Sequence, residues 1–264
     1  MAAISVRNIT HGFGAPADKG RILALQNLSL EVAEGEFVTL LGPSGCGKST
    51  LLNMIGGLLQ AAEGSVDVHG IPVREPMPDR IAYVFQESTL FPWYTVEENF
   101  AIQFRYRGVP RSEWELRTVA ALSSVGMQDF ARLYPKQLSV GMRQRINLAR
   151  GIASGSDILL IDEPFAALDE QSRMVLGEDL SALLSRTGKT ILFVTHSLAE
   201  AVFLSDRILV MSARPGRIKA VIAVDEPHPR PPEFMLQSRF GGLRNQCYAL
   251  LRDEIRQSMA EAAA

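Results

Sequence analysis

The sequence has few cysteines, no long hydrophobic run and little net charge. Its two cysteines, Cys46 and Cys247, are too few for a disulfide scaffold and are typical of a reducing compartment. The first residues, MAAISVRNITHGFG, lack the basic and apolar regions of a signal peptide, so we expect none. The longest apolar runs, such as ILLI and AVIAV, are too short to span a bilayer, so work at a membrane would require docking onto another subunit. The net charge of −2 predicts no nucleic-acid partner.

What remains is the composition of an ordinary globular protein. Hydrophobic residues make up 47% and charged residues 21% of the chain, which allows a substantial core. Strands are expected at Ile4–Thr10, Leu28–Val32, Phe37–Leu41, Ser65–His69, Ile81–Phe85, Ile158–Ile161, Thr190–Val194 and Ile208–Met211. Helices are expected at Lys48–Leu58, Glu97–Arg107, Ser112–Val125, Val140–Ala153, Gln171–Arg186, Ser197–Phe203 and Gln237–Met259.

Apolar strands that alternate with helices predict an α/β fold with a mainly parallel sheet and flanking helices. The turn-rich N-terminal strands are expected to form an antiparallel subdomain, with a loop at Gly12–Gly20. The helical stretch at about residues 88–155 interrupts the sheet as an inserted subdomain. We expect the core to cover residues 1–224, followed at 225–264 by the proline-rich linker Asp225–Glu233 and a C-terminal helix.

A glycine-rich segment, GPSGCGKS at Gly42–Ser49, fits the phosphate-loop pattern G-x-x-x-x-G-K-[ST]. It follows an apolar strand and opens a helix, so its backbone N–H groups would form an anion nest at the positive end of that helix. Lys48 would neutralise the β- and γ-phosphates, and the Ser49 hydroxyl would bind Mg²⁺. The alternative is a simple glycine turn before a helix. The predicted nucleotide-binding residues are Gly42, Pro43, Ser44, Gly45, Cys46, Gly47, Lys48, Ser49 and Thr50. This loop makes the predicted core a P-loop NTPase.

Two acids close the apolar strand in the segment ILLIDE, Ile158–Glu163. Nucleotide-binding folds place such carboxylates at the C-terminal edge of the sheet. Asp162 is predicted to hold Mg²⁺ through water, and Glu163 to polarise a water that attacks the γ-phosphate. The alternative is a strand that ends in ordinary surface acids.

These segments together resemble the nucleotide-binding subunits of ABC transporters, over about residues 4–215. Five further segments match the family's motifs in family order: Phe13 in HGFG, Gln86 in AYVFQE, LSVGM at Leu138–Met142, ALD at Ala167–Asp169, and His196 in VTHSLAEA. The resemblance implies that Phe13 stacks on adenine, that Gln86 reaches the Mg²⁺ and the attacking water, and that His196 contacts the γ-phosphate.

The resemblance also implies ATP and Mg²⁺ as cofactors and a second ATPase subunit, identical or not. Two subunits would close head to tail around two ATP molecules, so that Ser139 and Gly141 of one reach the nucleotide held by the other, with Asp169 at the junction. The remaining partners would be an integral-membrane permease and, indirectly, a periplasmic or extracellular solute-binding protein. The chain would then sit peripherally at the cytoplasmic face of the membrane. Aromatic residues in Phe91–Asn99 are candidates for the permease contact.

LSVGM matches the family's signature segment but departs from it at Val140 and at Met142, where many importer subunits of this kind also carry methionine. Ser139 is predicted to cap the helix Val140–Ala153 and to direct its hydroxyl and the following N–H groups at an anion. The family usually has glycine where this chain has Val140, and a β-branched residue restricts the backbone there. We therefore expect weakened hydrolysis at the nucleotide that this segment contacts, or pairing with a non-identical ATPase subunit.

The segment SARPGRI, Ser212–Ile218, and the tail resemble the importers of nitrate, sulfonates, taurine and related solutes. An Arg-Pro-Gly turn between strands is also ordinary hairpin chemistry. The alternatives are an ABC exporter ATPase and a soluble, non-transport ABC ATPase. A P-loop GTPase would need an Asn-Lys-x-Asp guanine-binding segment, which the sequence lacks.

Overall fold

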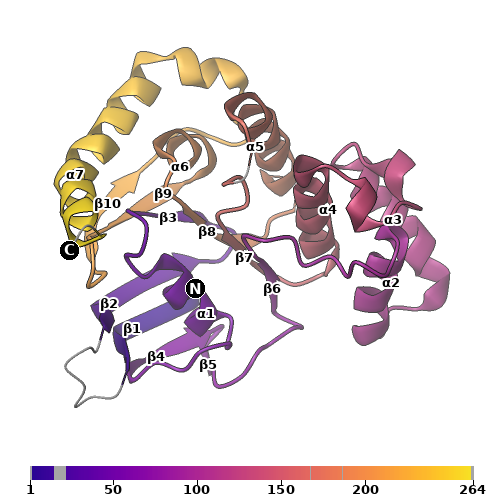
Figure 1. Ribbon diagram of the computed structural model, residues 1–264, viewed down its shortest axis with the longest axis horizontal. Coiled ribbons are helices and arrows are strands. Elements are labelled where there is room, and N and C mark those ends of the chain that lie inside the picture. Colours follow the sequence, from indigo (N-terminus) through magenta and orange to yellow (C-terminus); the bar gives the residue numbers. More distant parts are fainter. Residues whose placement is uncertain (1, 15–21, 167, 186, 263–264) are drawn as a thin grey trace.

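The computed structural model describes residues 2–14, 22–166, 168–185 and 187–262, and contains two sheets (Figure 1). The smaller sheet is antiparallel, in the order β2-β1-β4-β5. Its strands are Ala2–Phe13 (β1), Ile22–Ala33 (β2), Glu63–Val68 (β4) and Ile71–Pro72 (β5). The expected loop at Gly12–Gly20 is wrong at its start, because Gly12 and Phe13 pair with β2 as part of β1. Residues 15–20 lie outside the described residues.

The larger sheet has six strands in the order β10-β9-β3-β8-β7-β6. The strands are Phe37–Leu41 (β3), Ile81–Val84 (β6), Ile158–Asp162 (β7), Thr190–Thr195 (β8), Arg207–Met211 (β9) and Ile218–Ala223 (β10). All neighbours pair in parallel except β9 and β10. Every residue of β3, β7 and β8 is buried, as expected for strands covered on both faces. The predicted α/β class is therefore confirmed. The edge strand β10 had no expected bounds, although the Arg-Pro-Gly turn was expected to join two strands, and only one of its six residues is buried.

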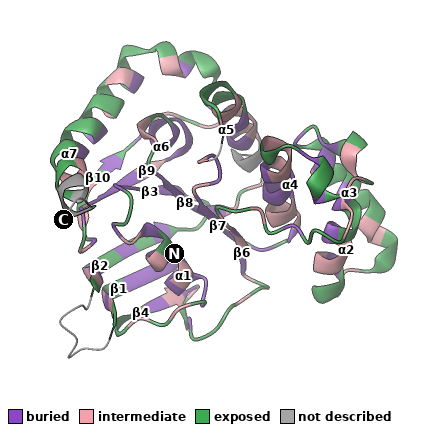
Figure 2. Cartoon of the chain, in the orientation of Figure 1, coloured by how far each residue is buried: buried purple, intermediate pink, exposed green. Residues whose placement is uncertain are grey.

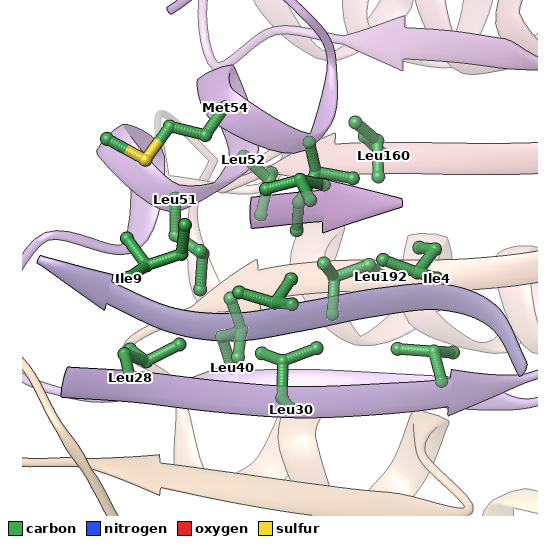
Figure 3. Packing of buried hydrophobic residues seen from close by; sticks show 14 of the residues in the cluster. Ile4, Ile9, Leu28, Leu30, Leu40, Leu51, Leu52, Met54, Leu160 and Leu192 are labelled. Atoms are coloured by element: carbon green, nitrogen blue, oxygen red, sulfur yellow. The ribbon is translucent and has the colours of Figure 1, made fainter. Parts of the chain in front are cut away.

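One helix, Lys48–Ile55 (α1), packs its apolar residues into the core shared by the two sheets. In Figure 3, Leu51, Leu52 and Met54 of this helix lie among side chains from both sheets. The labelled partners are Ile4, Ile9, Leu28, Leu30, Leu40, Leu160 and Leu192. The helix ends earlier than predicted, because Gly56 caps it and Gly57 has a φ of 74°, where helical backbone cannot continue.

The helical subdomain is inserted between β6 and β7, which are adjacent in the sheet, and it projects to one side (Figure 1). Its helices are Val96–Tyr106 (α2), Trp114–Ser123 (α3) and Val140–Ala153 (α4). They enclose a core of their own that includes Phe100, Phe104 and Ile146. The capping box of Thr95 and Glu98 fixes the start of α2. This separate core allows the subdomain to be a distinct unit attached at the end of the main sheet.

The tail packs against the main sheet's second core together with Glu170–Ser185 (α5) and Leu198–Leu204 (α6). Arg230 is buried and donates hydrogen bonds of 2.9 Å to the carbonyls of Val202 and Phe203. Phe234, in the short helix Pro232–Leu236, packs on Phe240 with ring centroids 5.4 Å apart. The last helix, Ser238–Ala262 (α7), is exposed along much of its described length (Figure 2). The tail thus shares the hydrophobic core that supports the sheet.

We expect Phe234→Ala to lower the free energy of unfolding by about 3 kcal/mol, because it removes a fully buried ring and leaves a cavity. The matched control is Leu236→Ala in the same short helix, where the side chain is 87% exposed and its loss should change little. Denaturant unfolding followed by circular dichroism measures both. Equal stabilities of the two variants would contradict a structural role for the tail.

Candidate nucleotide-binding site

The glycine-rich loop joins the C-terminal end of β3 to the start of α1, as the sequence predicts. Gly45 and Gly47 have φ angles of 77° and 100°, which L side chains rarely adopt. A Cβ atom on Gly47 would lie 2.6 Å from a Leu25 methyl group, so the position has neither the conformation nor the space for a side chain. The loop is therefore held as a backbone cradle at a helix N-terminus, the arrangement that binds phosphate.

The Lys48 ammonium group is buried inside this cradle. Its Nζ donates hydrogen bonds to the carbonyls of Gly42 at 3.0 Å and Pro43 at 2.9 Å. The same nitrogen lies 3.6 Å from Oε1 of Glu163. A buried ammonium needs such partners to offset its lost hydration. The geometry places one fixed positive charge where the phosphates of a nucleotide would approach.

Beside the lysine, the Ser49 hydroxyl donates to Oδ1 of Asp162 at 3.1 Å. Burial raises the pKa of Asp162, while the hydrogen bond from Ser49 and the charge of Lys48 act against that rise. The described residues contain no cluster of three or more His, Cys, Asp or Glu side chains that could hold a metal ion. Mg²⁺ commonly takes one or two carboxylates and completes its shell with phosphate oxygens and water. The oxygen pair of Ser49 and Asp162 fits a Mg²⁺ ion bound together with a nucleotide.

Glu163 follows β7 and is a non-glycine residue with a φ of 39°, in the left-handed region. Its backbone N–H donates to the carbonyl of Val194 at 3.0 Å, which holds the turn against β8. Its Oε2 lies 3.0 Å from Nδ1 of His196. This hydrogen bond is the largest cause both of the lowered pKa of Glu163 and of the raised pKa of His196. The carboxylate thus lies between two basic groups, Lys48 and His196, at the mouth of the loop.

The segment that carries His196 is anchored by a buried carboxylate. The Thr195 hydroxyl donates to Oε2 of Glu200 at 2.5 Å, and Oε1 of Glu200 lies 3.6 Å from Nε of Arg173. Ser197 caps α6 by accepting from the backbone N–H of Glu200 at 3.3 Å. Burial raises the pKa of Glu200, and Thr195 and Arg173 oppose that rise. Glu200 was not predicted from the sequence, because an acid at such a helical position is typical of an ordinary surface residue.

The phosphate loop opens into a pocket of about 450 Å³, a size typical of small-molecule sites. The pocket brings together the loop, the base-stacking candidate Phe13, Gln86 and the acidic Glu163. Its lining residues are Phe13, Ile22, Ala24, Ser44, Gly45, Gly47, Lys48, Ser49, Thr50, Gln86, Glu163 and Arg214. The Phe13 ring is 47% exposed, which leaves a face open for stacking. Predicted residues from four separate segments therefore meet at one cavity.

Two residues at this site were missed from the sequence. The Tyr83 hydroxyl donates to Oδ1 of Asn53 at 3.0 Å, and burial and the neighbouring Asp162 raise its pKa. A hydroxyl within an apolar strand was the available signal. Arg214 lines the pocket from the turn after β9. The sequence of this turn indicated a resemblance to one importer group and ordinary hairpin chemistry, but no role in nucleotide binding.

The signature residues lie apart from this pocket within the described chain. Ser139 caps α4 by accepting from the backbone N–H of Met142 at 3.2 Å, so the predicted N-cap is confirmed. Val140 lines a different cavity of about 470 Å³, together with Gln86 and Arg143. Asp169 accepts from the Ser172 backbone N–H and hydroxyl at 2.9 and 2.7 Å, hydrogen bonds that lower its pKa. Ala167 lies outside the described residues.

Comparison with known proteins agrees with this geometry. Residues 25–166 match the sequence model of the ABC transporter family. This chain belongs to the ABC transporter family. As a member of this family, the chain is an ATPase coupled to transport. None of the helices in the described part of the chain is both long enough and apolar enough to cross a membrane.

Three ABC transporter relatives illustrate the similarity. A putative ATP-binding protein of Brucella abortus is 43% identical over 93% of this chain and 92% of its own length. A taurine import ATP-binding protein of Rhizobium johnstonii is 45% identical over 76% of this chain and 77% of its own. The nitrate import ATP-binding protein NrtC of Synechococcus elongatus is 40% identical over 96% of this chain, but this covers only 39% of that longer protein.

A solved ABC transporter structure is similar in three dimensions. It is the dimeric post-hydrolysis state of the ATP-binding cassette MJ0796, bound to ADP and Pi. The similarity has a TM-score of 0.73 and 31% sequence identity, and covers 85% of this chain and all of that one. The predicted P-loop NTPase core is thereby confirmed.

We expect the pKa of His196 to lie above its ordinary value of 6.5 in the nucleotide-free protein, and to fall in Glu163→Gln. The folded state holds this proton more tightly, so the pair's stabilisation is present below pH 6.5 and is lost as the pH rises through the folded pKa. The lowered pKa of Glu163 sets the acid limit of the same stabilisation. The contribution of Glu163 is complete above its ordinary pKa of 4.5 and is lost as the pH falls from there through the folded pKa.

An NMR titration of the His196 ring measures this shift. Glu97→Gln on α2 is the control, because this exposed acid lies in the helical subdomain and should leave the midpoint unchanged. An unaltered midpoint in Glu163→Gln would show that the carboxylate does not hold the imidazole.

Proposed function

We propose that this chain is the ATP-hydrolysing subunit of an ABC importer and that Glu163 is its catalytic base. The convergence of Lys48, Glu163 and His196 at the phosphate loop supports this proposal most strongly. Lys48 and the loop N–H groups hold the phosphates. Ser49 and Asp162 would hold Mg²⁺, which would neutralise charge on the phosphates. Glu163 accepts a proton from the attacking water, and His196 and Gln86 contact the γ-phosphate and the water. Catalysis would then come mainly from positioning and charge stabilisation.

The second part of the proposal is that two such chains, identical or related, form the active unit. Ser139 and Val140 lie at the start of α4, and Val140 is 44% exposed, so this segment is open to a partner. The loop pocket of the same chain has no lining from this segment. Head-to-tail pairing would bring the Ser139 cap, Gly141 and Asp169 to the partner's nucleotide. The dimeric state named for the MJ0796 cassette supports this arrangement.

The third part concerns transport. The names of the taurine and nitrate import relatives support uptake of a small anion or organic solute. That solute would pass through a separate permease and be delivered by a periplasmic or extracellular binding protein, with this chain on the cytoplasmic face of the membrane. A cavity of about 470 Å³ between the main sheet and the helical subdomain offers a docking place for the permease. Phe91 lines it, and the neighbouring Trp93 is exposed, as a partner contact requires.

Glu163→Gln should lower ATP turnover by about 100-fold or more while leaving ATP binding close to that of the parent, because the amide keeps the shape but cannot accept a proton. Steady-state phosphate release measures turnover, and equilibrium binding of ATP measures affinity. Glu63→Gln, an exposed acid of β4, serves as the control. Turnover near the parent rate in Glu163→Gln would remove Glu163 from the mechanism.

Val140→Gly should raise ATP turnover by several-fold, because glycine relieves the backbone restriction where the partner's phosphate would approach. Val119→Gly is the matched control, since this exposed valine of α3 lies in the helical subdomain outside the signature segment. Turnover is compared at saturating ATP. If Val140→Gly and the parent hydrolyse at the same rate, the valine does not limit the reaction.

A further inference from the structure

The turn between β9 and β10 packs directly on the phosphate loop. A Cβ atom on Gly216 would lie 2.1 Å from the Cys46 carbonyl oxygen, so only glycine permits this contact. The Gly216 N–H donates to the carbonyl of Ala24 at 2.8 Å, and its own carbonyl accepts from Gln26 at 3.1 Å. The turn is thus fixed both to the loop and to β2. The approach follows from the sheet order, because β9 and β3 are parallel neighbours whose C-terminal ends share one edge.

This turn carries Arg214 into the nucleotide pocket. The Arg214 Nε donates to the carbonyl of Gly45 at 3.3 Å. A terminal guanidinium nitrogen lies 3.0 Å from the place that a Cβ atom on Gly45 would occupy. The side chain lines the same pocket as Phe13 and Lys48. Across residues 2–14, 22–166, 168–185 and 187–262, it has no other hydrogen bond and no ion pair.

The guanidinium is therefore a positive charge with unused donors beside the loop. The neighbouring Lys48 is already paired with Glu163, which also binds His196. Arginine remains charged at all working pH values and presents several N–H groups in a planar fork that suits phosphate oxygens. A polyphosphate seated in the cradle is a partner that matches both the sign of this charge and its geometry.

The C-terminal helix holds this turn in place. Oε2 of Glu254 accepts from the Ala213 backbone N–H at 2.7 Å, next to Arg214. Oε1 of Glu254 accepts from Nζ of Lys219 at 2.6 Å, and Lys219 also donates to the carbonyl of Leu250 at 2.9 Å. Figure 1 shows the later part of α7 beside β10. One carboxylate of the tail therefore binds both Ala213, which precedes Arg214 in the turn, and Lys219 on β10, the strand that follows.

We propose that Arg214 is a further phosphate-binding residue of the nucleotide site and that Glu254 is its positioning residue. The C-terminal helix then contributes to nucleotide affinity although it contacts no nucleotide. This inference rests on the proposed ATP-binding function and extends it to a residue outside the recognised motifs. It concerns the polyphosphate part of the ligand, not the base.

The test compares equilibrium binding of ATP and of adenosine to full-length variants. Arg214→Ala should weaken ATP binding by about ten-fold, the loss expected for one charge-assisted hydrogen bond, and leave adenosine binding unchanged. Arg214→Lys keeps the charge but loses the planar fork of N–H groups, so its affinity for ATP should lie between those of the parent and Arg214→Ala. Arg217→Ala is the matched control, because Arg217 belongs to the same turn but its side chain bonds to Gln26 instead of the loop.

The role of Glu254 has a separate readout. Glu254→Gln should weaken ATP binding by about three-fold, because the neutral amide holds the turn less firmly. In the double variant with Arg214→Ala the affinity should equal that of Arg214→Ala alone, since a positioning residue has no effect once the residue it positions is gone. Additive losses would mean that Glu254 acts by another route, and would overturn its assigned role.

The outcomes separate this inference from the function on which it rests. If the parent fails to bind ATP, or Lys48→Ala binds as the parent does, the proposed function itself is wrong. If the parent binds ATP and Arg214→Ala binds it equally well, only the role of Arg214 is wrong. Equal weakening of ATP and adenosine binding by Arg214→Ala would also overturn it, because the loss would then not concern the phosphates.

Discussion

The buried ammonium group of Lys48 is the interaction on which the rest of the site depends. An unpaired charge in that position would be strongly destabilising, so the loop carbonyls and Glu163 must converge on it. That convergence requires glycines in left-handed conformations on the loop and a strained backbone at Glu163. Burial of apolar side chains of α1 and β3 in the core shared by both sheets offsets the free energy of this backbone strain.

The order of the strands converts this one charge into a complete site. The strands β3, β8 and β7 are neighbours, so their C-terminal ends meet at one edge of the sheet. This edge holds the phosphate loop after β3, His196 after β8, and Asp162 with Glu163 at the end of β7. The two acids have pKa shifts of opposite direction, because burial dominates at Asp162 and the hydrogen bond from His196 dominates at Glu163. Neighbouring carboxylates are thereby suited to different roles, one beside Ser49 and one beside a basic imidazole.

The same edge of the sheet continues to β9, and the turn after β9 connects the tail to the nucleotide site. The turn after β9 touches the loop through Gly216 and Arg214, and α7 touches the turn through Glu254. A helix that shares hydrophobic core with α5 and α6 is thus connected by hydrogen bonds to the nucleotide pocket. This gives the fold a physical route from its C-terminal end to its phosphate loop.

The sequence by itself determined the local features of this protein. The bounds of β3 and α4 agree residue for residue with those expected, and Ser139 caps α4 as predicted, because burial pattern, turn chemistry and capping act over a few residues. The motif order also gave the family and the P-loop core. Only the tertiary structure decided that Arg214 meets Gly45 and that Glu254 meets Ala213, pairs that lie 169 and 41 residues apart. Such contacts depend on which strands become neighbours in the sheet, and periodicity along a single chain carries no information about that order.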